Sequence, residues 1–511
     1  MRKNQEKIYR AIINNSKGIA ITISLLYGLP VMFTPYVGDE IWAIYLFGSQ
    51  YLNDPTLLLK RPINEIPVWL NAGNFRPLGR LFEHLGYLIP MLMTSLTNLT
   101  PEFWYSLNRL LLWVLFQFCI FLFCKNVFKK NSEEGNIAAL ICVIVSNSIS
   151  LVNSQSGGLR LFPTFYTTSA IVIILSLNYI MQSTTKKAKT SKNNLIKIFI
   201  GIVAASYNEL TNVIIPVSLI LIYMSVQNKN TLHRIIESFR EITYVVIPFL
   251  VIWLPTRIYI SKFCSINDCY EPSNLSFNSL FGGTVLRRFT SSIPPLPFLT
   301  SKEWLNLNSS SLQLKLFSFL LMICVTLILS LLVGALLNLH SFSRKPNLNK
   351  LGIVGFSSLS ITAVAVSLSS ELQKQHIFGI SWRETPLYIF SISLLAVYLL
   401  FKTLSHSKYY LLIKKIYGAI FVIFFSVMSF LTPFANAQLT SLYQLEPRAK
   451  LSKLIESELV SSSTSPSEKE QICLKLFDKN LFSENISLTL QQGINEYTKF
   501  KSDKLFCVSN S

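Results

Sequence analysis

The chain has 511 residues, of which 50% are hydrophobic and only 14% are charged. Soluble domains carry about 25% charged residues, so this composition, with a mean hydropathy of +0.43, excludes an ordinary soluble protein. The net charge of +20 does not indicate nucleic-acid binding, because Lys and Arg cluster between apolar runs, as in the cytoplasmic loops of membrane proteins. We expect an all-α integral membrane protein with no nucleic-acid partner.

Apolar runs of about 17–25 residues predict the membrane spans. The first run follows a basic N-terminal stretch and is expected to be a retained span that also targets the protein. Residues 195–226 are long for one span and have basic flanks on both sides, so we expect a tight hairpin with its tip at Tyr207-Asn208-Glu209. Counting the hairpin as two, we predict about eleven transmembrane helices. The other spans are expected near residues 18–37, 103–124, 137–153, 162–181, 241–260, 313–338, 352–370, 386–401 and 416–433.

The basic loops set the expected orientation, since Lys and Arg accumulate on the cytoplasmic side. The N-terminus is predicted to be cytoplasmic and the C-terminus outside. The membrane domain, residues 1–433, then includes a long first outer loop, residues 38–102, and is followed by a small outer C-terminal segment, residues 434–511. Residues 85–97 are too short for a span and are predicted to form an amphipathic or interfacial helix within the first outer loop.

Four cysteines fall in predicted outer segments. Cys264 and Cys269 share one loop, and Cys473 and Cys507 share the C-terminal segment. Thiols pair on the oxidising side of a membrane, so we predict two disulfides, with unpaired thiols as the alternative. A zinc site is disfavoured, because no histidine lies at ligand spacing near either pair.

Two acids, Asp39 and Glu40, directly follow the first predicted span. At the outer membrane surface one carboxylate can act as general base toward a sugar hydroxyl. Its neighbour can orient the acceptor or bind a divalent cation, which is the one cofactor we consider. The metal ligands stay unknown at this point, and a solvated helix end is the alternative.

Arginines and acids recur beside other predicted spans. Arg76 and Arg80, one helical turn apart in the first outer loop, are candidates for binding a phosphate or for contacting lipid headgroups. Glu209 lies in an apolar setting, where a carboxylate is usually functional, unless it is a turn residue in water. Arg383 and Glu384 precede a span and are candidates for a phosphate or sugar contact. No nucleotide-binding loop, zinc-protease motif or nucleophile elbow is present.

The pattern resembles the GT-C class of multi-span glycosyltransferases. An inside N-terminus, one span and a long outer loop that opens with Asp39-Glu40 and continues with Phe75-Arg76-Pro77-Leu78 are similar to bacterial serotype-type O-antigen glucosyltransferases. The motifs cover about the first 100 residues, and the rest is similar only in span pattern and in Glu209. The second acid is Glu here, whereas Asp is commoner in the family, and the C-terminal segment carries no family motif.

The resemblance implies an enzyme of the bacterial inner membrane that takes a sugar from a polyprenyl-phosphate donor. The sugar would pass, with inversion, to a cell-surface glycan or lipid acceptor on the outer face. Asp39 would be the general base, Glu40 a supporting acid or metal ligand, and Arg76 and Arg383 the groups that hold the donor phosphate. Donor, acceptor and membrane lipids are the implied partners.

Three other functions remain open. An O-antigen-type polymerase or ligase would depend on arginines in a middle or late outer loop, such as Arg287 and Arg288. A transporter or flippase of lipid-linked glycans would need charges along a path inside the spans. A non-catalytic scaffold of an envelope complex would use the C-terminal segment as its partner surface. The transferase alone requires Asp39.

Overall fold

The computed structural model describes most of the chain, and the described part is helical apart from one isolated bridge between Leu275 and Ser369. The described residues are 3–37, 39–97, 99–128, 132–151, 158–185, 191–226, 231–267, 269, 275–291, 293, 296, 311–338, 347–374, 383–405, 411–460, 466–478, 481–502 and 505–507. The all-α class predicted from the sequence is therefore confirmed.

Within the described residues, six helices are long and apolar enough to cross a membrane. They are α8 (Pro101–Val127), α10 (Pro163–Thr185), α16 (Leu312–Asn338), α17 (Asn347–Ser367), α19 (Thr385–Ser405) and α20 (Leu411–Gln444). By length and composition, the structure therefore supports six spans and not the predicted number of about eleven transmembrane helices. The main reason is length, because a straight crossing takes about 20 residues and several of the expected spans are shorter helices. These are α2 (Ser16–Met32), α9 (Glu133–Ser148), α11 (Ser191–Ser206) and α12 (Ile214–Ser225).

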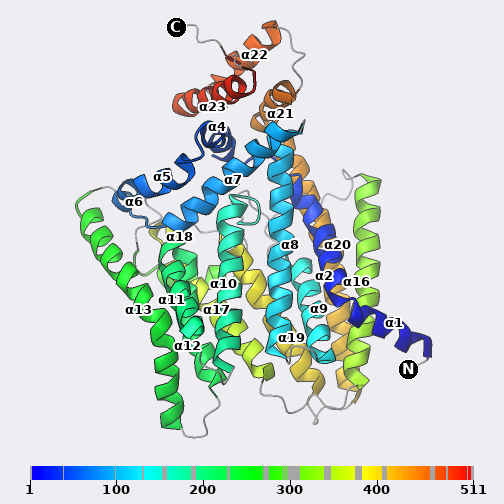
Figure 1. Ribbon diagram of the computed structural model, residues 1–511. Coiled ribbons are helices and arrows are strands. Elements are labelled where there is room, and N and C mark those ends of the chain that lie inside the picture. Colours follow the sequence, from blue (N-terminus) through cyan, green and yellow to red (C-terminus); the bar gives the residue numbers. More distant parts are fainter. Residues whose placement is uncertain are drawn as a thin grey trace.

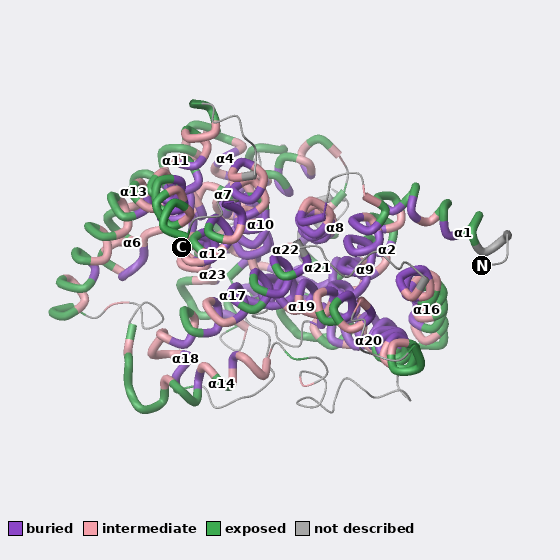
Figure 2. Tube along the Cα trace, turned by 90° about the horizontal axis from the view of Figure 1, so that it is seen from below, coloured by how far each residue is buried: buried purple, intermediate pink, exposed green. Residues whose placement is uncertain are grey.

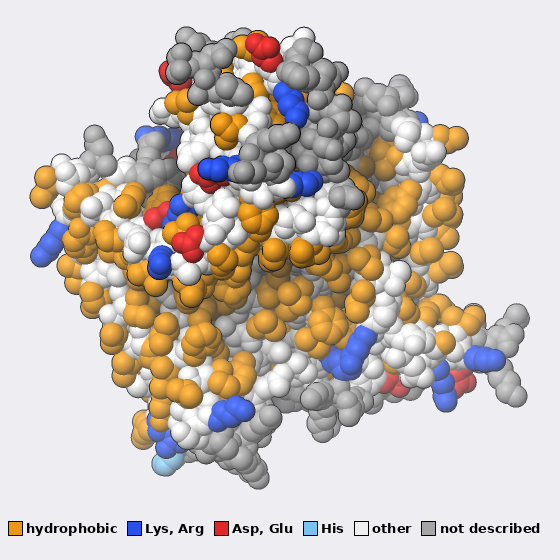
Figure 3. Space-filling model, turned by 45° about the horizontal axis from the view of Figure 1, so that its top comes forward, with side chains coloured by type: hydrophobic (Ala, Val, Ile, Leu, Met, Phe, Trp, Pro, Cys, Tyr) orange, Lys and Arg blue, Asp and Glu red, His pale blue; other side chains and the backbone are white. Residues whose placement is uncertain are grey.

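The helices stand side by side in one bundle (Figures 1 and 2), in which α9 packs against α2, α8, α19 and α20. Residues 137–148 of α9 are all buried, and they join the large hydrophobic core that α8, α10 and α19 also line. Hydrophobic side chains cover the flank of the bundle that Figure 3 shows, whereas the coloured charged groups lie mostly near its two ends. This distribution is that of an α-helical membrane protein.

The two ends of the bundle are differently covered (Figure 1). Helix α1 (Lys3–Asn14) lies at one end. At the other end, which we call the cap end, the first-loop helices and the C-terminal helices lie across the bundle. Helix α13 (Thr231–Cys264) runs along the side toward the cap end, where α18 (Ser370–Lys374) also lies (Figure 1), and α14 (Phe281–Ser291) packs against α17 and α18.

The predicted first outer loop is a set of packed helices. They are α3 (Glu40–Ala43), the π-helix η1 (Ile44–Gly48), α4 (Ser49–Asn53), α5 (Leu57–Asn64), α6 (Ile66–Asn71) and α7 (Pro77–Leu96). Helix α7 includes the predicted interfacial helix but begins earlier, because Pro77 suits the first position of a helix. Gly79 lets α7 approach closely, since a Cβ there would lie 2.1 Å from the Tyr207 carbonyl oxygen.

The predicted hairpin is confirmed at its tip. Helix α11 ends at Ser206, and the chain resumes as the 3₁₀-helix η2 (Glu209–Val213) and α12. Asn208 caps η2, because its side chain accepts a hydrogen bond from the Thr211 amide at 3.1 Å. The hydrogen bond from the Thr211 amide to Asn208 stabilises the turn that packs against α7. As a result, Glu209 lies at the cap end of the bundle.

Helix α20 continues as one helix across residue 434, the predicted start of the C-terminal segment, to Gln444. Helices α21 (Pro447–Val460), α22 (Pro466–Leu476) and α23 (Glu484–Ser502) then pack on the first-loop helices through a second hydrophobic core. Both predicted disulfides, Cys264–Cys269 and Cys473–Cys507, are present. The latter joins α22 to the residues after α23.

Candidate functional site

Two adjoining cavities lie where the first-loop helices meet the ends of the bundle helices. The Asp39 cavity, named for the acid on its wall, has a volume of about 320 Å³. The Glu209 cavity has a volume of about 240 Å³. Four residues line both: Asn74, Arg76, Tyr166 and Arg383. The sequence-predicted residues Asp39, Arg76, Glu209 and Arg383, which lie far apart in the chain, are thus brought to one place.

The Asp39 cavity is polar and aromatic. Asp39 is exposed at the start of α3, and its carboxylate accepts a hydrogen bond from the Trp42 indole nitrogen at 3.2 Å. This bond orients one carboxylate oxygen while leaving the side chain in reach of solvent. The other lining residues are Ala43, Phe47, Glu65, Trp69, Arg80, Glu83, His84, Tyr87, Phe162 and Phe165.

Arg80 is held by its neighbours on one wall of the Asp39 cavity. Its guanidinium lies 3.6 Å from the centre of the Trp69 ring, and it donates to Glu83 at 2.6 Å. Tyr87 donates to the other oxygen of Glu83, also at 2.6 Å. Arg80 lines this cavity but not the Glu209 cavity, so its positive charge lies at the Asp39 cavity alone.

His84 is a member of the site that sequence reasoning missed. Its side chain is buried, its Nδ1 lies 2.6 Å from the Tyr51 hydroxyl, and its Nε2 lies 3.8 Å from a Glu65 carboxylate oxygen. Nε2 has no hydrogen-bond partner among the residues that the structure describes. Since buried polar groups normally have partners, this nitrogen is suited to meet a ligand in the Asp39 cavity. The sequence carried one signal for it: His84 follows Arg80 by four residues, which places both on the same face of a helix.

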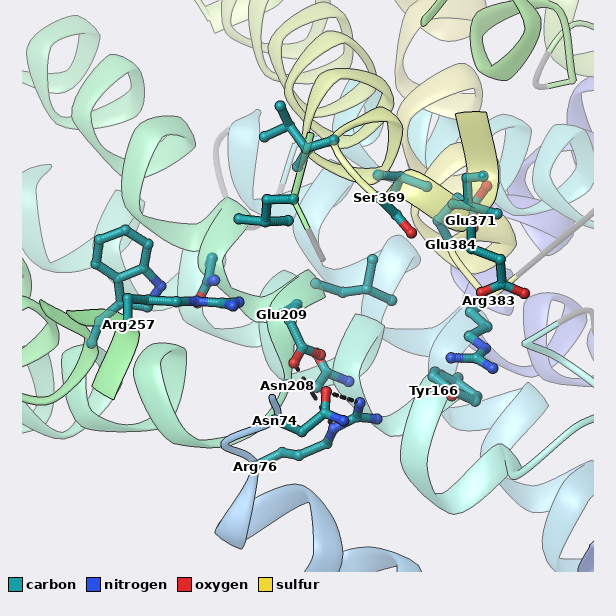
Figure 4. A pocket seen from close by; sticks show the side chains of 18 residues that line it. Asn74, Arg76, Tyr166, Asn208, Glu209, Arg257, Ser369, Glu371, Arg383 and Glu384 are labelled. Atoms are coloured by element: carbon teal, nitrogen blue, oxygen red, sulfur yellow. Dashed lines mark hydrogen bonds and ion pairs between the residues drawn. The ribbon is translucent and has the colours of Figure 1, made fainter. Parts of the chain in front are cut away.

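Arg76 and Arg383 lie at the boundary between the two cavities (Figure 4). Arg76 donates to the Asn74 side chain at 2.5 Å, and its Nε lies 3.9 Å from Glu209. The Arg383 guanidinium lies 5.5 Å from the centre of the Tyr166 ring. A ligand that reached from one cavity to the other would therefore pass both guanidinium groups.

The Glu209 cavity lies between η2, α13 and the cap ends of α17 and α19, and its wall combines apolar side chains with charged ones. A third arginine, Arg257 of α13, points into it from the side opposite Arg383 (Figure 4). Sequence analysis did not single out Arg257, although an arginine within a predicted span, here 241–260, is itself a functional signal. The remaining lining residues are Asn208, Leu210, Asn212, Trp253, Leu275, Ala365, Val366, Leu368, Ser369, Glu371, Leu372 and Glu384.

Glu40 does not line either cavity. Its carboxylate is fully buried and accepts hydrogen bonds from the Tyr105 hydroxyl at 2.5 Å, the Phe162 amide at 2.6 Å and the Val37 amide at 2.8 Å. Burial raises the pKa of Glu40, and the nearby Arg109, 3.8 Å away, opposes this effect. These contacts make Glu40 a structural junction between the first loop, α8 and α10.

Glu384 is buried at the start of α19 and pairs with Arg288 at 3.5 Å. Burial raises its pKa, although Arg288 acts in the opposite direction. Arg287 donates to Thr284 at 2.8 Å. The arginines on which a polymerase was expected to depend therefore contact α14, α18 and Glu384, and neither lines the two cavities.

The residues near Asp39 do not by themselves define a metal centre. Among the described parts of the chain, no group of three or more His, Cys, Asp or Glu side chains is arranged to hold a metal ion. Glu40, for which the resemblance implies a supporting acid or a metal ligand, already accepts hydrogen bonds from Tyr105 and Val37. The identity of any ligands for a divalent cation stays unassigned.

Comparison of the sequence with protein-family models and with curated proteins finds no match. The site must therefore be interpreted from its own geometry. It combines an oriented carboxylate, two arginines at a boundary and, beyond them, a cavity with apolar as well as charged side chains on its wall. Such a set can bind a molecule that has a polar part, an anionic centre and an apolar part.

Proposed function

We propose that this protein is a membrane glycosyltransferase that uses a polyprenyl-phosphate-linked sugar. One observation carries the proposal: Arg76 and Arg383 stand between the Asp39 cavity, which offers a carboxylate and other polar groups, and the Glu209 cavity, whose wall includes apolar side chains such as Leu210, Trp253 and Leu368. A lipid-phosphate sugar has the same order of parts, with the phosphate between sugar and tail. The resemblance of the first-loop motifs to GT-C enzymes points to the same class, but the proposal rests on this geometry.

The donor would place its phosphate at the boundary and its first isoprene units against the apolar side chains of the Glu209 cavity, such as Leu210, Trp253 and Leu368. Guanidinium groups bind phosphate oxygens in pairs, and Arg257 adds a third cation on the far wall. A separate apolar groove of about 460 Å³ lies between α12 and α13, lined by Leu219, Tyr223, Phe239 and their neighbours. It offers the rest of the tail a surface that is apolar apart from Ser238 and the Tyr223 hydroxyl.

The acceptor would bind in the Asp39 cavity. Trp42 and Trp69 offer flat apolar faces, while Glu65, Glu83 and His84 offer groups that bond hydroxyls. A lipid chain would leave the buried His84 Nε2 without a hydrogen-bond partner, which costs about 1–3 kcal/mol. The lining thus favours a carbohydrate acceptor over a lipid one.

The reaction can be written with the residues in place. An acceptor hydroxyl oxygen attacks the anomeric carbon, and its proton passes to the Asp39 carboxylate. The bond from the anomeric carbon to the phosphate oxygen breaks, and its electron pair stays on the phosphate. Arg76 and Arg383 stabilise the charge that grows there. Configuration inverts, because the hydroxyl enters opposite the departing phosphate.

The cap end would then face outward from a bacterial inner membrane, with the N-terminus cytoplasmic. Both disulfides lie in segments of this end, which agrees with an oxidising compartment. A membrane-impermeant probe tests the orientation: a single reporter cysteine placed at the exposed Ser457 should react in intact cells, whereas one at the exposed Lys7 should react only after lysis.

The function is tested by comparing Asp39→Asn and Arg383→Ala with wild type at matched membrane levels, scoring surface glycans by mass spectrometry. Loss of a general base lowers rates by about 10²–10⁴-fold, so a sugar decoration should disappear while chain length holds. Arg287→Ala is the matched control and should leave the decoration intact. Loss of chain length in Arg287→Ala, with Asp39→Asn normal, would favour the polymerase or ligase instead.

A transporter or flippase gives a different result, because it forms no glycosidic bond. Membranes containing the wild-type protein should then show no transfer from a synthetic polyprenyl-phosphate sugar to a glycan acceptor, whereas the proposed enzyme transfers the sugar and Asp39→Asn does not. The transporter reading also predicts that lipid-linked glycan accumulates on the cytoplasmic side of the membrane when the protein is absent.

A further inference from the structure

The hairpin tip holds one carboxamide in a defined orientation. The side-chain oxygen Oδ1 of Asn208 accepts a hydrogen bond from the Thr211 amide at 3.1 Å. A backbone amide can only donate, so the atom that faces it must be the oxygen of the carboxamide, and the nitrogen Nδ2 points away from the cap. Asn208 is only 4% exposed, yet Nδ2 has no hydrogen-bond partner within the described part of the chain.

The turn around Asn208 is held on several sides. The Thr211 hydroxyl accepts a hydrogen bond from the Asn208 amide at 3.4 Å. The preceding residue, Tyr207, donates through its hydroxyl to the Thr164 carbonyl oxygen at 3.3 Å, and its own carbonyl packs closely on α7 at Gly79. A donor that is fixed in this way loses little conformational entropy when it binds a ligand.

A second buried donor shares this wall of the Glu209 cavity. Arg76 and Asn208 both line the cavity, and Figure 4 shows them on the same side of it as Glu209. Arg76 donates through Nη2 to Asn74, whereas its Nε has no hydrogen-bond partner in the described ranges. The Glu209 carboxylate lies 3.9 Å from Nε, which is too far for a hydrogen bond. Two buried N–H donors of one wall are thus suited to meet oxygens of a ligand.

The charges on the wall favour an anionic ligand. Three arginines and three acids line the Glu209 cavity: Arg76, Arg257, Arg383, Glu209, Glu371 and Glu384. Glu384 is already paired with Arg288, which does not line the cavity. Three arginines therefore face two acids, Glu209 and Glu371. An excess of positive charge, together with two unpartnered donors, selects a ligand whose oxygens accept hydrogen bonds and carry negative charge.

We propose that Asn208 is a binding residue of the site: its Nδ2 donates, together with Arg76 Nε, to an oxyanion at the edge of the Glu209 cavity. The naming of this oxyanion as the phosphate of the lipid donor rests on the proposed function. The N-cap alone does not require an amide, because Asp and Ser cap helices about as well as Asn does. What Asn208 adds to the cap is a neutral donor of fixed direction, which orients an oxygen that the arginines attract.

Substitutions that keep the cap and remove the nitrogen test the proposal. Asn208→Asp and Asn208→Ser both retain an oxygen that can cap η2, but neither contains Nδ2. The binding of farnesyl phosphate to the purified full-length protein in detergent is measured by native mass spectrometry, with farnesol as the uncharged reference. Wild type should prefer farnesyl phosphate to farnesol. Both variants should bind farnesyl phosphate roughly 10–100-fold more weakly, since a hydrogen bond to a charged group is lost, and should bind farnesol as wild type does.

Thr211→Val is the matched control. It removes the hydroxyl that accepts from the Asn208 amide and leaves Nδ2 in place, so it should lower the free energy of unfolding and keep the affinity for farnesyl phosphate. Wild-type affinity in both Asn208 variants, or an equal loss in Thr211→Val, would overturn the proposal. A loss in Asn208→Asp with wild-type affinity in Asn208→Ser would also overturn it, because repulsion by the new charge would then explain the loss. A wild type that binds both ligands equally would show that no oxyanion site exists.

Binding and transfer are measured separately, so this proposal and the proposed function can fail independently. Farnesyl phosphate binding that depends on Asn208, without transfer from a synthetic polyprenyl-phosphate sugar, would keep the oxyanion site and reject the glycosyltransferase. Transfer by wild type, with unchanged affinity in both Asn208 variants, would do the reverse. If both proposals hold, Asn208→Ser should raise the KM for the donor more than it lowers kcat, because the hydrogen bond is made in the bound donor as well as in the transition state.

Discussion

Replacing Glu40 with alanine tests whether Glu40 stabilises the fold while its neighbour Asp39 carries the chemistry. The carboxylate is fully buried, accepts hydrogen bonds from Tyr105, Phe162 and Val37, and faces Arg109. Removing one partner of a buried ion pair costs about 3–5 kcal/mol, because the other charge stays buried without compensation. We expect Glu40→Ala to lose about that much stability.

The assay is reversible unfolding of the purified protein in detergent, followed by circular dichroism. Glu40→Gln keeps one accepting oxygen and should lose about 1–3 kcal/mol. Asp39→Ala is the matched control: its side chain is exposed, so stability should stay within about 0.5 kcal/mol. A Glu40→Ala protein as stable as wild type would refute the structural assignment and return Glu40 to the role of supporting acid or metal ligand.

Three further outcomes are expected. Gly79→Ala should destabilise by about 1–3 kcal/mol, because its methyl group would overlap the hairpin tip; Gly18→Ala, with open space around it, is the control in the same unfolding assay. Cys473→Ser should cost about 2–4 kcal/mol through loss of the bond to Cys507, and limited proteolysis should then cut the C-terminal helices first. Since folding raises the pKa of Glu456 from 4.5 to about 8, the folded state binds more protons between these values. The free energy of unfolding should therefore fall as pH rises from about 4.5 to about 8, by up to about 1.4 kcal/mol per pH unit. Glu456→Gln should show a shallower fall, and equal slopes in both proteins would contradict the linkage.

Local patterns in the sequence predicted the elements well. Hydropathy located the apolar helices, because each must bury or present an apolar surface along its length. The position of cysteines predicted both disulfides, and the break at Tyr207-Asn208 followed from the length of residues 195–226. The number of spans was predicted less well, since helix length depends on tilt and packing as much as on composition.

The sequence by itself thus determined an all-helical membrane protein and drew attention to Asp39, Arg76, Glu209 and Arg383, since scarce charges beside apolar runs stand out. Only the tertiary structure decided which of them meet. Asp39 and Glu40 are adjacent in the chain, yet one lines a cavity and the other is buried against α8, because the first turn of α3 directs them apart. Long-range packing of the C-terminal helices on this turn has no local sequence signal, since its contacts join residues about 400 positions apart.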